Sequence, residues 1–123
     1  MSSEGYIYIM RMNENNNLIK VGYSKNPIER RRQLYRTGNP TPLNIYHLWF
    51  VSDMRLAEKA AHICLRKHRV NNRREFFEIA DALHFTEFER SCYDTTSTYL
   101  DALIDCIEDT FDCADLQYQR ISP

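Results

Sequence analysis

Two short runs rich in β-branched and aromatic residues constrain the fold of this chain most. Residues 5–10 read Gly-Tyr-Ile-Tyr-Ile-Met and residues 18–23 read Leu-Ile-Lys-Val-Gly-Tyr, with the polar stretch 13–17 between them. Such runs favour strands, and a short polar connection favours an antiparallel hairpin. A loop centred near Glu14 predicts Tyr8 opposite Lys20 and Tyr6 opposite Gly22, on one face of the sheet.

The following residues predict helices and a further strand. Asn26 and Pro27, with Glu29 three residues after Asn26, are typical of a helix start, and this helix should end near Arg36. Residues 44–51 form a third strand, whose continuous apolar character predicts burial on both faces. A longer helix should run from Asp53 to about residue 68, and residues 75–79 add a short strand or buried turn. The apolar arc predicted for the longer helix contains Leu56, Ala57, Ala60, Ala61, Ile63 and Cys64.

Charge is distributed very unevenly along the chain, although the formal net charge is only -1. Residues 1–79 hold 14 Lys and Arg against 7 Asp and Glu, whereas residues 80–123 hold 2 against 10. A basic surface of this kind favours a polyanionic partner, and nucleic acid is the first candidate. The same division predicts a core over residues 1–79 and an acidic helical extension over residues 80–123.

The acidic extension permits several interpretations. Helices near 82–90 and 96–111 could pack on the core or form a homodimer contact, with their acids facing solvent. Alternatively, the acids could occupy the basic cleft and restrain activity. A protein-interaction adaptor that uses this extension is a further possibility.

Length and composition exclude several classes of protein. The 123 residues suit one ordinary domain, and four cysteines without a Cys-x-x-Cys pair argue against a disulfide framework or a zinc site. Neither an apolar run long enough to span a membrane nor a secretion signal is visible. We therefore expect a cytoplasmic protein, in a bacterial or infected host cell, with no membrane partner.

Several residues could together cleave a phosphodiester bond. This chemistry needs a base, a cation facing the phosphate and usually a carboxylate that holds a divalent ion. Tyr8 or Lys20 could act as or assist the base, Arg30 could bind the phosphate, and Glu58 could ligate magnesium or manganese. Each also has a structural interpretation: strand tyrosines usually pack, and Glu58 could simply pair with His62 four residues later.

These residues resemble the motifs of the GIY-YIG nuclease superfamily. Ile7-Tyr8 looks like the first motif, Lys20-Val21-Gly22 like the second, and Arg30 and Glu58 like the helix arginine and metal-binding glutamate. The details resemble a subgroup frequent in phages and DNA viruses, notably Asn26-Pro27, Gly38-Asn39-Pro40, Ala57-Glu58 and Arg74-Glu75-Phe76-Phe77. The resemblance implies an α/β (α+β) fold, with a three-stranded antiparallel sheet flanked by helices and the site across the sheet face.

The function implied by the resemblance is that of a metal-dependent DNA endonuclease of phage or mobile-element origin, using one Mg²⁺ or Mn²⁺ ion. The alternative is a catalytically inactive DNA-binding or inhibitor module on the same fold. The predicted catalytic residues are Tyr8, Lys20, Tyr23, Arg30 and His62, with Glu58 at the metal. The predicted nucleic-acid-binding residues are Arg31, Arg32, Tyr35, Arg36, Asn39, Lys59 and Arg66.

Overall fold

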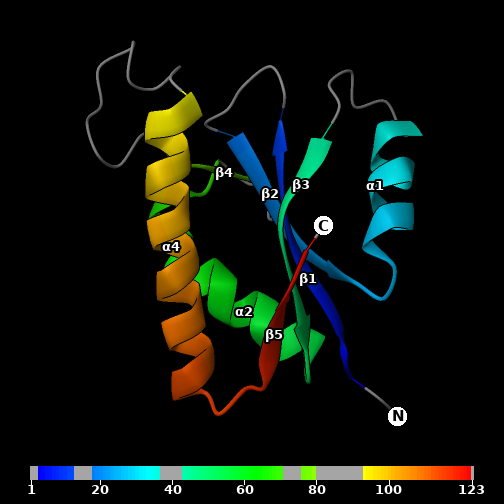
Figure 1. The fold of residues 1–123 in the computed structure, drawn as a ribbon, viewed down its shortest axis with the longest axis vertical. Coiled ribbons are helices and arrows are strands. Elements are labelled where there is room, and N and C mark those ends of the chain that lie inside the picture. The colour runs from blue at the N-terminus through cyan, green and yellow to red at the C-terminus, as the bar shows by residue number, and fades with distance from the viewer. Residues whose placement is uncertain (1–2, 13–17, 37–42, 71–75, 80–92, 123) are drawn as a thin grey trace.

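The computed structural model describes residues 3–12, 18–36, 43–70, 76–79 and 93–122. These residues contain a five-stranded antiparallel sheet in the order β4-β2-β1-β3-β5, together with three α-helices and one 3-10 turn (Figure 1). In chain order the elements are β1 (Gly5–Met12), β2 (Leu18–Ser24), α1 (Pro27–Arg36), β3 (Leu43–Val51), α2 (Met54–Cys64), η1 (Arg66–His68), β4 (Phe76–Glu78), α4 (Tyr93–Cys113) and β5 (Tyr118–Ile121).

The predicted three-stranded sheet is wrong, because the sheet carries a further strand at each edge. β4 pairs with Leu18–Lys20 of β2 and lies within residues 75–79, where a strand or turn was expected. β5 pairs with the last four residues of β3 and was not predicted at all. Its four residues include Gln119 and Arg120, so they lack the apolar alternation that indicates a strand from sequence.

The register of the central hairpin also differs from the prediction. Tyr8 lies opposite Gly22 and Met10 lies opposite Lys20, which is two residues away from the predicted pairing. A shift of two residues changes each partner but keeps every side chain on the same face of the sheet, because side chains alternate with period two. The predicted sharing of one face by Tyr8 and Lys20 is therefore confirmed.

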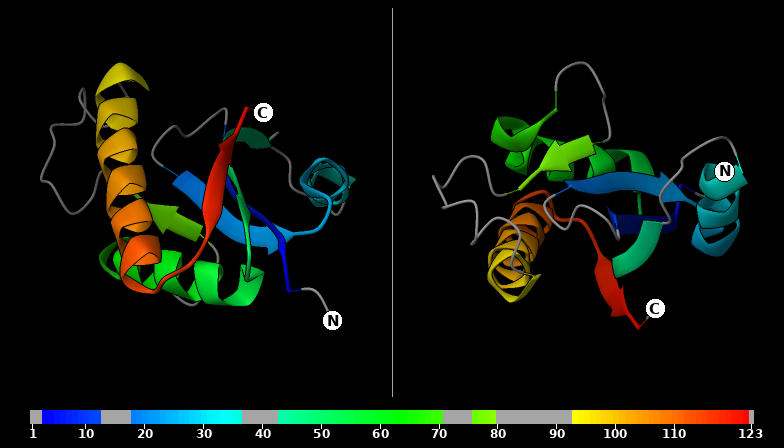
Figure 2. Two further views of the ribbon diagram at one scale, coloured as in Figure 1. Left: turned by 60° about the horizontal axis from the view of Figure 1, so that its bottom comes forward. Right: turned by 90° about the horizontal axis from the view of Figure 1, so that it is seen from above.

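Both faces of the sheet are covered. On one face Ile7, Ile9 and Trp49 pack in a core with α2 and α4, and on the other Tyr8 and Met10 pack in a second cluster that includes Leu34 of α1. Figure 1 and the right-hand view of Figure 2 show α1 and α4 on opposite sides of the sheet. The predicted burial of β3 on both faces is confirmed, since β3 contributes to both clusters.

The helices begin where their caps predict. The side chains of Asn26 and Asp53 accept hydrogen bonds from the backbone N–H groups three residues later, at 3.1 and 3.2 Å. α2 ends at Cys64, before the predicted end, and its inward face consists of Met54 and three alanines. Leu56 and Ile63 were predicted to face the core, but 41% and 61% of their surfaces are exposed.

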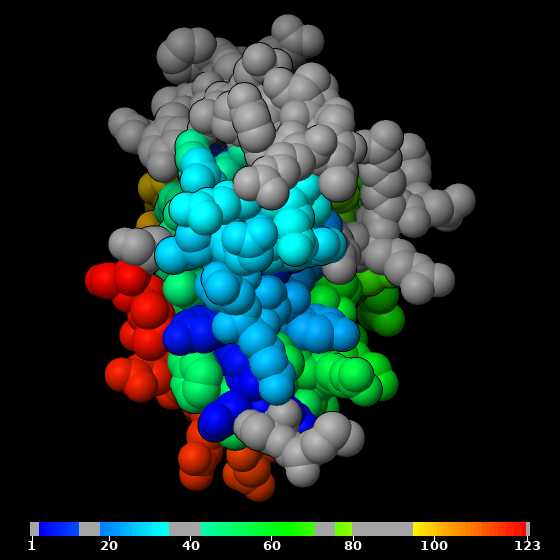
Figure 3. All heavy atoms as spheres, turned by 90° about the vertical axis from the view of Figure 1, so that its right-hand side faces the viewer, coloured from blue at the N-terminus to red at the C-terminus, as the bar shows by residue number. Residues whose placement is uncertain are grey.

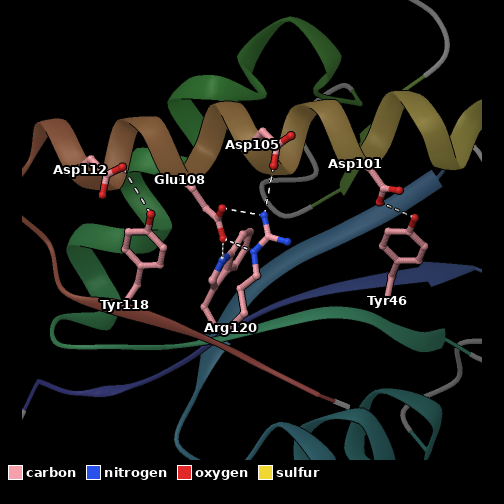
Figure 4. A network of polar contacts seen from close by, with 8 residues as sticks. Tyr46, Asp101, Asp105, Glu108, Asp112, Tyr118 and Arg120 are labelled. Carbon is pink, nitrogen blue, oxygen red and sulfur yellow. Dashed lines mark hydrogen bonds and ion pairs between the residues drawn. The ribbon is translucent and has the colours of Figure 1, made fainter.

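α4 packs an apolar face into the core, and its acidic residues also bond to the sheet (Figure 4). The Glu108 carboxylate accepts hydrogen bonds from the Trp49 indole N–H at 2.8 Å and from the Arg120 guanidinium at 2.6 and 2.7 Å. Tyr46 of β3 donates to Asp101 at 2.7 Å, and burial together with this bond raises the pKa of Tyr46 to about 12. The predicted helix 96–111 lies within α4, whereas the predicted helix 82–90 lies outside the described residues.

Two predictions about the extension stay open. Division of the chain at residue 80 into core and extension stays a prediction, as does dimerisation through the extension.

Among the described residues, no helix combines the length and the apolar character that a membrane span requires.

The contact between Gly22 and Tyr8 predicts a steric effect on stability. A Cβ on Gly22 would collide with the Tyr8 phenol, lying 2.7 Å from Cζ, and Tyr8 is almost fully buried. Gly22→Ala should therefore lower the free energy of unfolding by about 1–3 kcal/mol, measured by urea denaturation. In a Tyr8→Leu background the loss should shrink, and an unchanged loss there would contradict the steric origin. Gly5→Ala serves as a control, because the atoms nearest to its Cβ would belong to the flexible Met54 side chain.

The Glu108 contacts predict a pH dependence of stability. Hydrogen bonds from Arg120 lower the pKa of the Glu108 carboxyl, burial opposes them, and the bond from Trp49 lowers the pKa further. A carboxyl with a lowered pKa stabilises the fold above its unfolded value of about 4.3 and loses that effect as the pH falls through its folded value. Glu108→Gln should therefore be less stable than wild type at pH 7 and approach it in stability near pH 3.

Urea denaturation followed by Trp49 fluorescence measures this difference at each pH. Asp109→Asn is a suitable control because Asp109 is exposed on the same helix, and it should leave the pH dependence almost unchanged. If the stabilities of Glu108→Gln and wild type stay equally far apart down to pH 3, the Glu108 carboxylate is not a source of the pH dependence.

Candidate nucleic-acid interface on helix α2

The outer face of α2 and the residues just after it line a hollow of about 640 Å³. Side chains three and four positions apart on a helix lie on one face, which brings the polar residues of α2 into a single stripe. Tyr23, at the end of β2, completes the described lining from the sheet. The described lining residues are Tyr23, Arg55, Glu58, Lys59, His62, Ile63, Arg66 and Arg69.

Positive charge dominates the described lining. Arg55, Lys59, Arg66 and Arg69 are all exposed, and the carboxylate among them belongs to Glu58. Glu58 is half-buried, and its Oε2 atom is buried. A concave surface with several cations concentrates anions, so this arrangement favours a phosphate-bearing ligand.

His62 is positioned by the neighbouring strand. Its Nε2 atom lies 3.0 Å from the backbone carbonyl oxygen of Val21, and its ring packs edge-on against Phe77 with centroids 5.2 Å apart. A carbonyl oxygen only accepts hydrogen bonds, so the neutral ring carries its hydrogen on Nε2. Nδ1 is then the nitrogen that can take up a proton.

Arg69, Arg55 and Ile63 line the hollow but were not predicted as site residues. Arg69 follows η1, forms an isolated β-bridge with Phe77, and places its guanidinium carbon 5.7 Å from the centre of the Phe77 ring. The available signal was the run Arg66-Lys67-His68-Arg69, which continues the basic character of the helix past its end.

Tyr8 and Lys20 lie on the other face of the sheet. Tyr8 packs in the cluster that faces α1, with its ring over Gly22. Lys20 is also buried, and its Nζ atom lies 4.9 Å from the centre of the Phe76 ring. Neither residue belongs to the described lining of the hollow, so the structure separates these two predicted catalytic residues from Glu58, His62 and Tyr23.

The arginines of α1 are also outside the described lining. Arg31 donates from Nε to the Leu43 carbonyl at 2.7 Å and from Nη2 to the Asn44 side chain at 3.1 Å, which ties α1 to β3. Arg32 lies 3.9 Å from Glu29, four-tenths or more of each side chain being exposed. Arg30 is half-buried on the same helix.

Three further residues were predicted to contact nucleic acid. The side chains of Tyr35 and Arg36, and the whole of Asn39, lie outside the described residues.

Figure 3 shows the cyan surface of α1, blue residues beside it and green residues of the α2 region on the same side of the molecule. A long polyanion on that side could reach both helices.

The side chains that could act as metal ligands decide whether the described residues fit a metal ion. They contain no group of three or more His, Cys, Asp and Glu side chains that could hold a metal. Glu58 alone supplies a carboxylate to the described lining. This donor set suits an ion held mainly by water and substrate oxygens, and excludes, within the described residues, a closed protein cage.

Comparison with known proteins gives a different family from the one expected. The family model of the T5orf172 domain matches residues 5–108. The chain belongs to the T5orf172 domain family. The predicted membership of the GIY-YIG superfamily and its phage and viral subgroup was therefore wrong. Two of the residues behind it, Tyr8 and Gly22, occur together for a packing reason, because the ring occupies the space above the glycine.

T5orf172 domains are often associated with phage and mobile-element proteins that bind DNA or are nuclease-like. No curated protein and no solved structure matches the chain. The family therefore makes DNA a plausible partner, and the geometry of the hollow shows where contact could occur.

Proposed function

We propose that the hollow on α2 binds DNA through its phosphates and hydrolyses a phosphodiester bond there. The observation that carries this proposal is the meeting of four cations with the Glu58 carboxylate and the His62 imidazole in one concave surface. The association of the family with DNA-binding and nuclease-like proteins supports the same conclusion. The proposed activity is hydrolysis of DNA by a member of the T5orf172 domain family, and it is not assigned to another family of nucleases.

Binding rests on the cationic side chains. A guanidinium can donate two parallel hydrogen bonds to a phosphate, so Arg55, Arg66 and Arg69 can each orient one, whereas Lys59 acts as a point charge. These contacts release counterions from DNA, so affinity falls steeply with salt. The arginines nearest the reacting phosphate also stabilise the negative charge that develops during attack.

Glu58 would hold one Mg²⁺ or Mn²⁺ ion together with oxygens of the substrate. Such ions are commonly bound through one or two carboxylates plus waters and phosphates, which matches a lining with one described carboxylate. When bound, the ion would polarise a phosphoryl oxygen. The requirement for substrate oxygens means that ion and DNA should bind cooperatively.

Proton transfer falls to His62 in this proposal. As the oxygen of a water molecule bonds to phosphorus, Nδ1 takes one of its protons, and the ester P–O bond breaks. The departing oxygen takes a proton from solvent and the His62 imidazolium returns its proton to solvent, so the overall reaction is hydrolysis. The hydrogen bond from Nε2 to the Val21 carbonyl keeps the ring in the tautomer that this step needs.

A second function is DNA binding without cleavage. It is favoured by the absence of a group of three metal-ligating side chains from the described part of the chain. Both functions use the same hollow and the same cations. They differ in whether Glu58 and His62 take part in chemistry, so a pair of measurements separates them.

The binding step predicts a contrast between two adjacent residues. Arg66 lines the hollow, whereas its neighbour Lys67 is also exposed but lies outside the described lining. Arg66→Ala should weaken binding to a short duplex and reduce the slope of log affinity against log salt by about 1, whereas Lys67→Ala should change neither appreciably. Fluorescence anisotropy in chelator measures both. Equal effects of the two substitutions would contradict a role for this particular hollow.

The hydrolytic step predicts a specific loss of activity. Glu58→Gln should lower magnesium- or manganese-dependent nicking of a supercoiled plasmid by about 100-fold or more, because several kcal/mol of charge stabilisation is lost. DNA affinity in chelator should be retained or rise, because the substitution removes a negative charge that repels phosphate. Glu29→Gln is the control, because Glu29 is an acid of α1 outside the described lining.

Two results would contradict hydrolysis at this site. Undiminished nicking by Glu58→Gln would remove the carboxylate from the reaction. DNA binding by wild type with no nicking in either metal would instead support the module that binds without cleaving.

A further inference from the structure

Two apolar side chains are exposed within the cationic hollow. Tyr23 is 37% exposed and Ile63 is 61% exposed, and both belong to the described lining. Phosphate binding requires neither an aromatic ring nor an aliphatic chain. Single exposed apolar residues are common on proteins, but a tyrosine and an isoleucine in one basic concavity form a surface with two chemical characters.

The position of Tyr23 follows from the geometry of β2. Tyr23 lies on the same face as Ile19 and Val21, which are completely buried. The described pairing of β2 with β4 ends at Lys20, so Tyr23 lies beyond it, near the outer stripe of α2. The strand thus directs an aromatic side chain to the site instead of to the core.

The position of Ile63 follows from the helix. The inward face of α2 contains the buried residues Met54, Ala57, Ala60 and Ala61. Ile63 lies between His62 and the end of the helix on the outward side, within the stripe that also carries Lys59. Folding leaves this side chain available to a ligand.

We infer that the hollow receives an unpaired nucleotide of a DNA strand, with its base stacked on Tyr23 and in contact with Ile63. This inference rests on the proposed binding of DNA phosphates by the surrounding cations. A combination of cationic groove and aromatic platform is how proteins bind single strands without strong sequence preference, because every base has a flat face. Paired bases in a duplex are covered by their neighbours, so the ring can contact a base only where the strand is single, bulged or frayed.

The size of the hollow agrees with a nucleotide. Its volume of about 640 Å³ falls within the ~300–1,000 Å³ of sites for small molecules and cofactors. Together with the exposed Tyr23 ring, this volume favours DNA with unpaired nucleotides as the ligand over an uninterrupted duplex.

Three DNA ligands of matched sequence test this inference: a 15-nucleotide single strand, its blunt duplex, and the duplex with one unpaired adenine. 2-Aminopurine replaces the unpaired adenine, and one adenine of the single strand, for a fluorescence readout. Affinities are measured in chelator, so that cleavage does not intervene. The only tryptophan, Trp49, is completely buried, so quenching of the probe on binding reports stacking on another ring.

Wild type should bind the single strand and the bulged duplex at least about 5-fold more tightly than the blunt duplex, since stacking contributes the equivalent of ~1–3 kcal/mol per base. Tyr23→Ala should abolish this preference and the quenching, because affinity for the single strand and the bulged duplex falls by a larger factor than affinity for the blunt duplex. Tyr23→Phe should retain both, because the ring stays. Ile63→Ala should weaken the preference, whereas Leu56→Ala, on the same helix and 41% exposed outside the described lining, should not.

The outcomes distinguish this inference from the function on which it rests. Equal affinity of wild type for the three ligands, or an equal loss for all three in Tyr23→Ala, would overturn stacking, while a loss for all three in Arg66→Ala would still support phosphate binding. Undetectable binding of every ligand by wild type would overturn both. Trp49 fluorescence and thermal unfolding confirm that each variant is folded.

Discussion

Burial of β1 on both faces is the constraint on which the rest of the structure depends. Ile7 and Ile9 point to one face and Tyr8 and Met10 to the other, and all four have almost no exposed surface. A strand that is apolar on both sides needs cover on both sides, which α1 supplies on one face and α2 with α4 on the other. Since the space on both faces is filled with close-packed side chains, the exposed cations of the hollow lie on the outer surface of a covering helix, α2, and just after it.

The separation of charge along the sequence has a physical outcome in the fold. The acids of α4 that contact Tyr46, Trp49 and Arg120 face β3 and β5, where hydrogen bonds from the sheet satisfy them. Residues of α4 are absent from the described lining of the basic hollow. The described acids of α4 that make these contacts therefore bond to the sheet and do not line the basic hollow. These contacts also explain how a chain with almost no net charge presents a strongly cationic concavity.

Local sequence patterns predicted individual helices and strands better than they predicted how these elements pack together. Caps at Asn26 and Asp53 and the apolar run of β3 are encoded within a few residues, so the helices and the first three strands could be recognised. β5 could not, because its pairing with β3 depends on α4 returning the chain to the sheet edge, with Asp115 adopting a left-handed φ of 54° in the turn. The placement of Glu58 and His62 beside basic residues followed from helical spacing. Their separation from Tyr8 by the sheet required knowledge of which helix covers which face.

Glu58 is the residue that most strongly distinguishes catalysis from simple binding. A carboxylate in a phosphate-binding hollow repels the ligand that its cationic neighbours attract, so it weakens a module whose only task is to hold DNA. This cost is offset if the carboxylate shares a divalent ion with the phosphate, because the ion attracts both groups. The same arrangement places His62, whose Nε2 is held by the Val21 carbonyl, in the same hollow with Nδ1 as its basic nitrogen. The proposed role of Glu58 in hydrolysis rests on this charge balance.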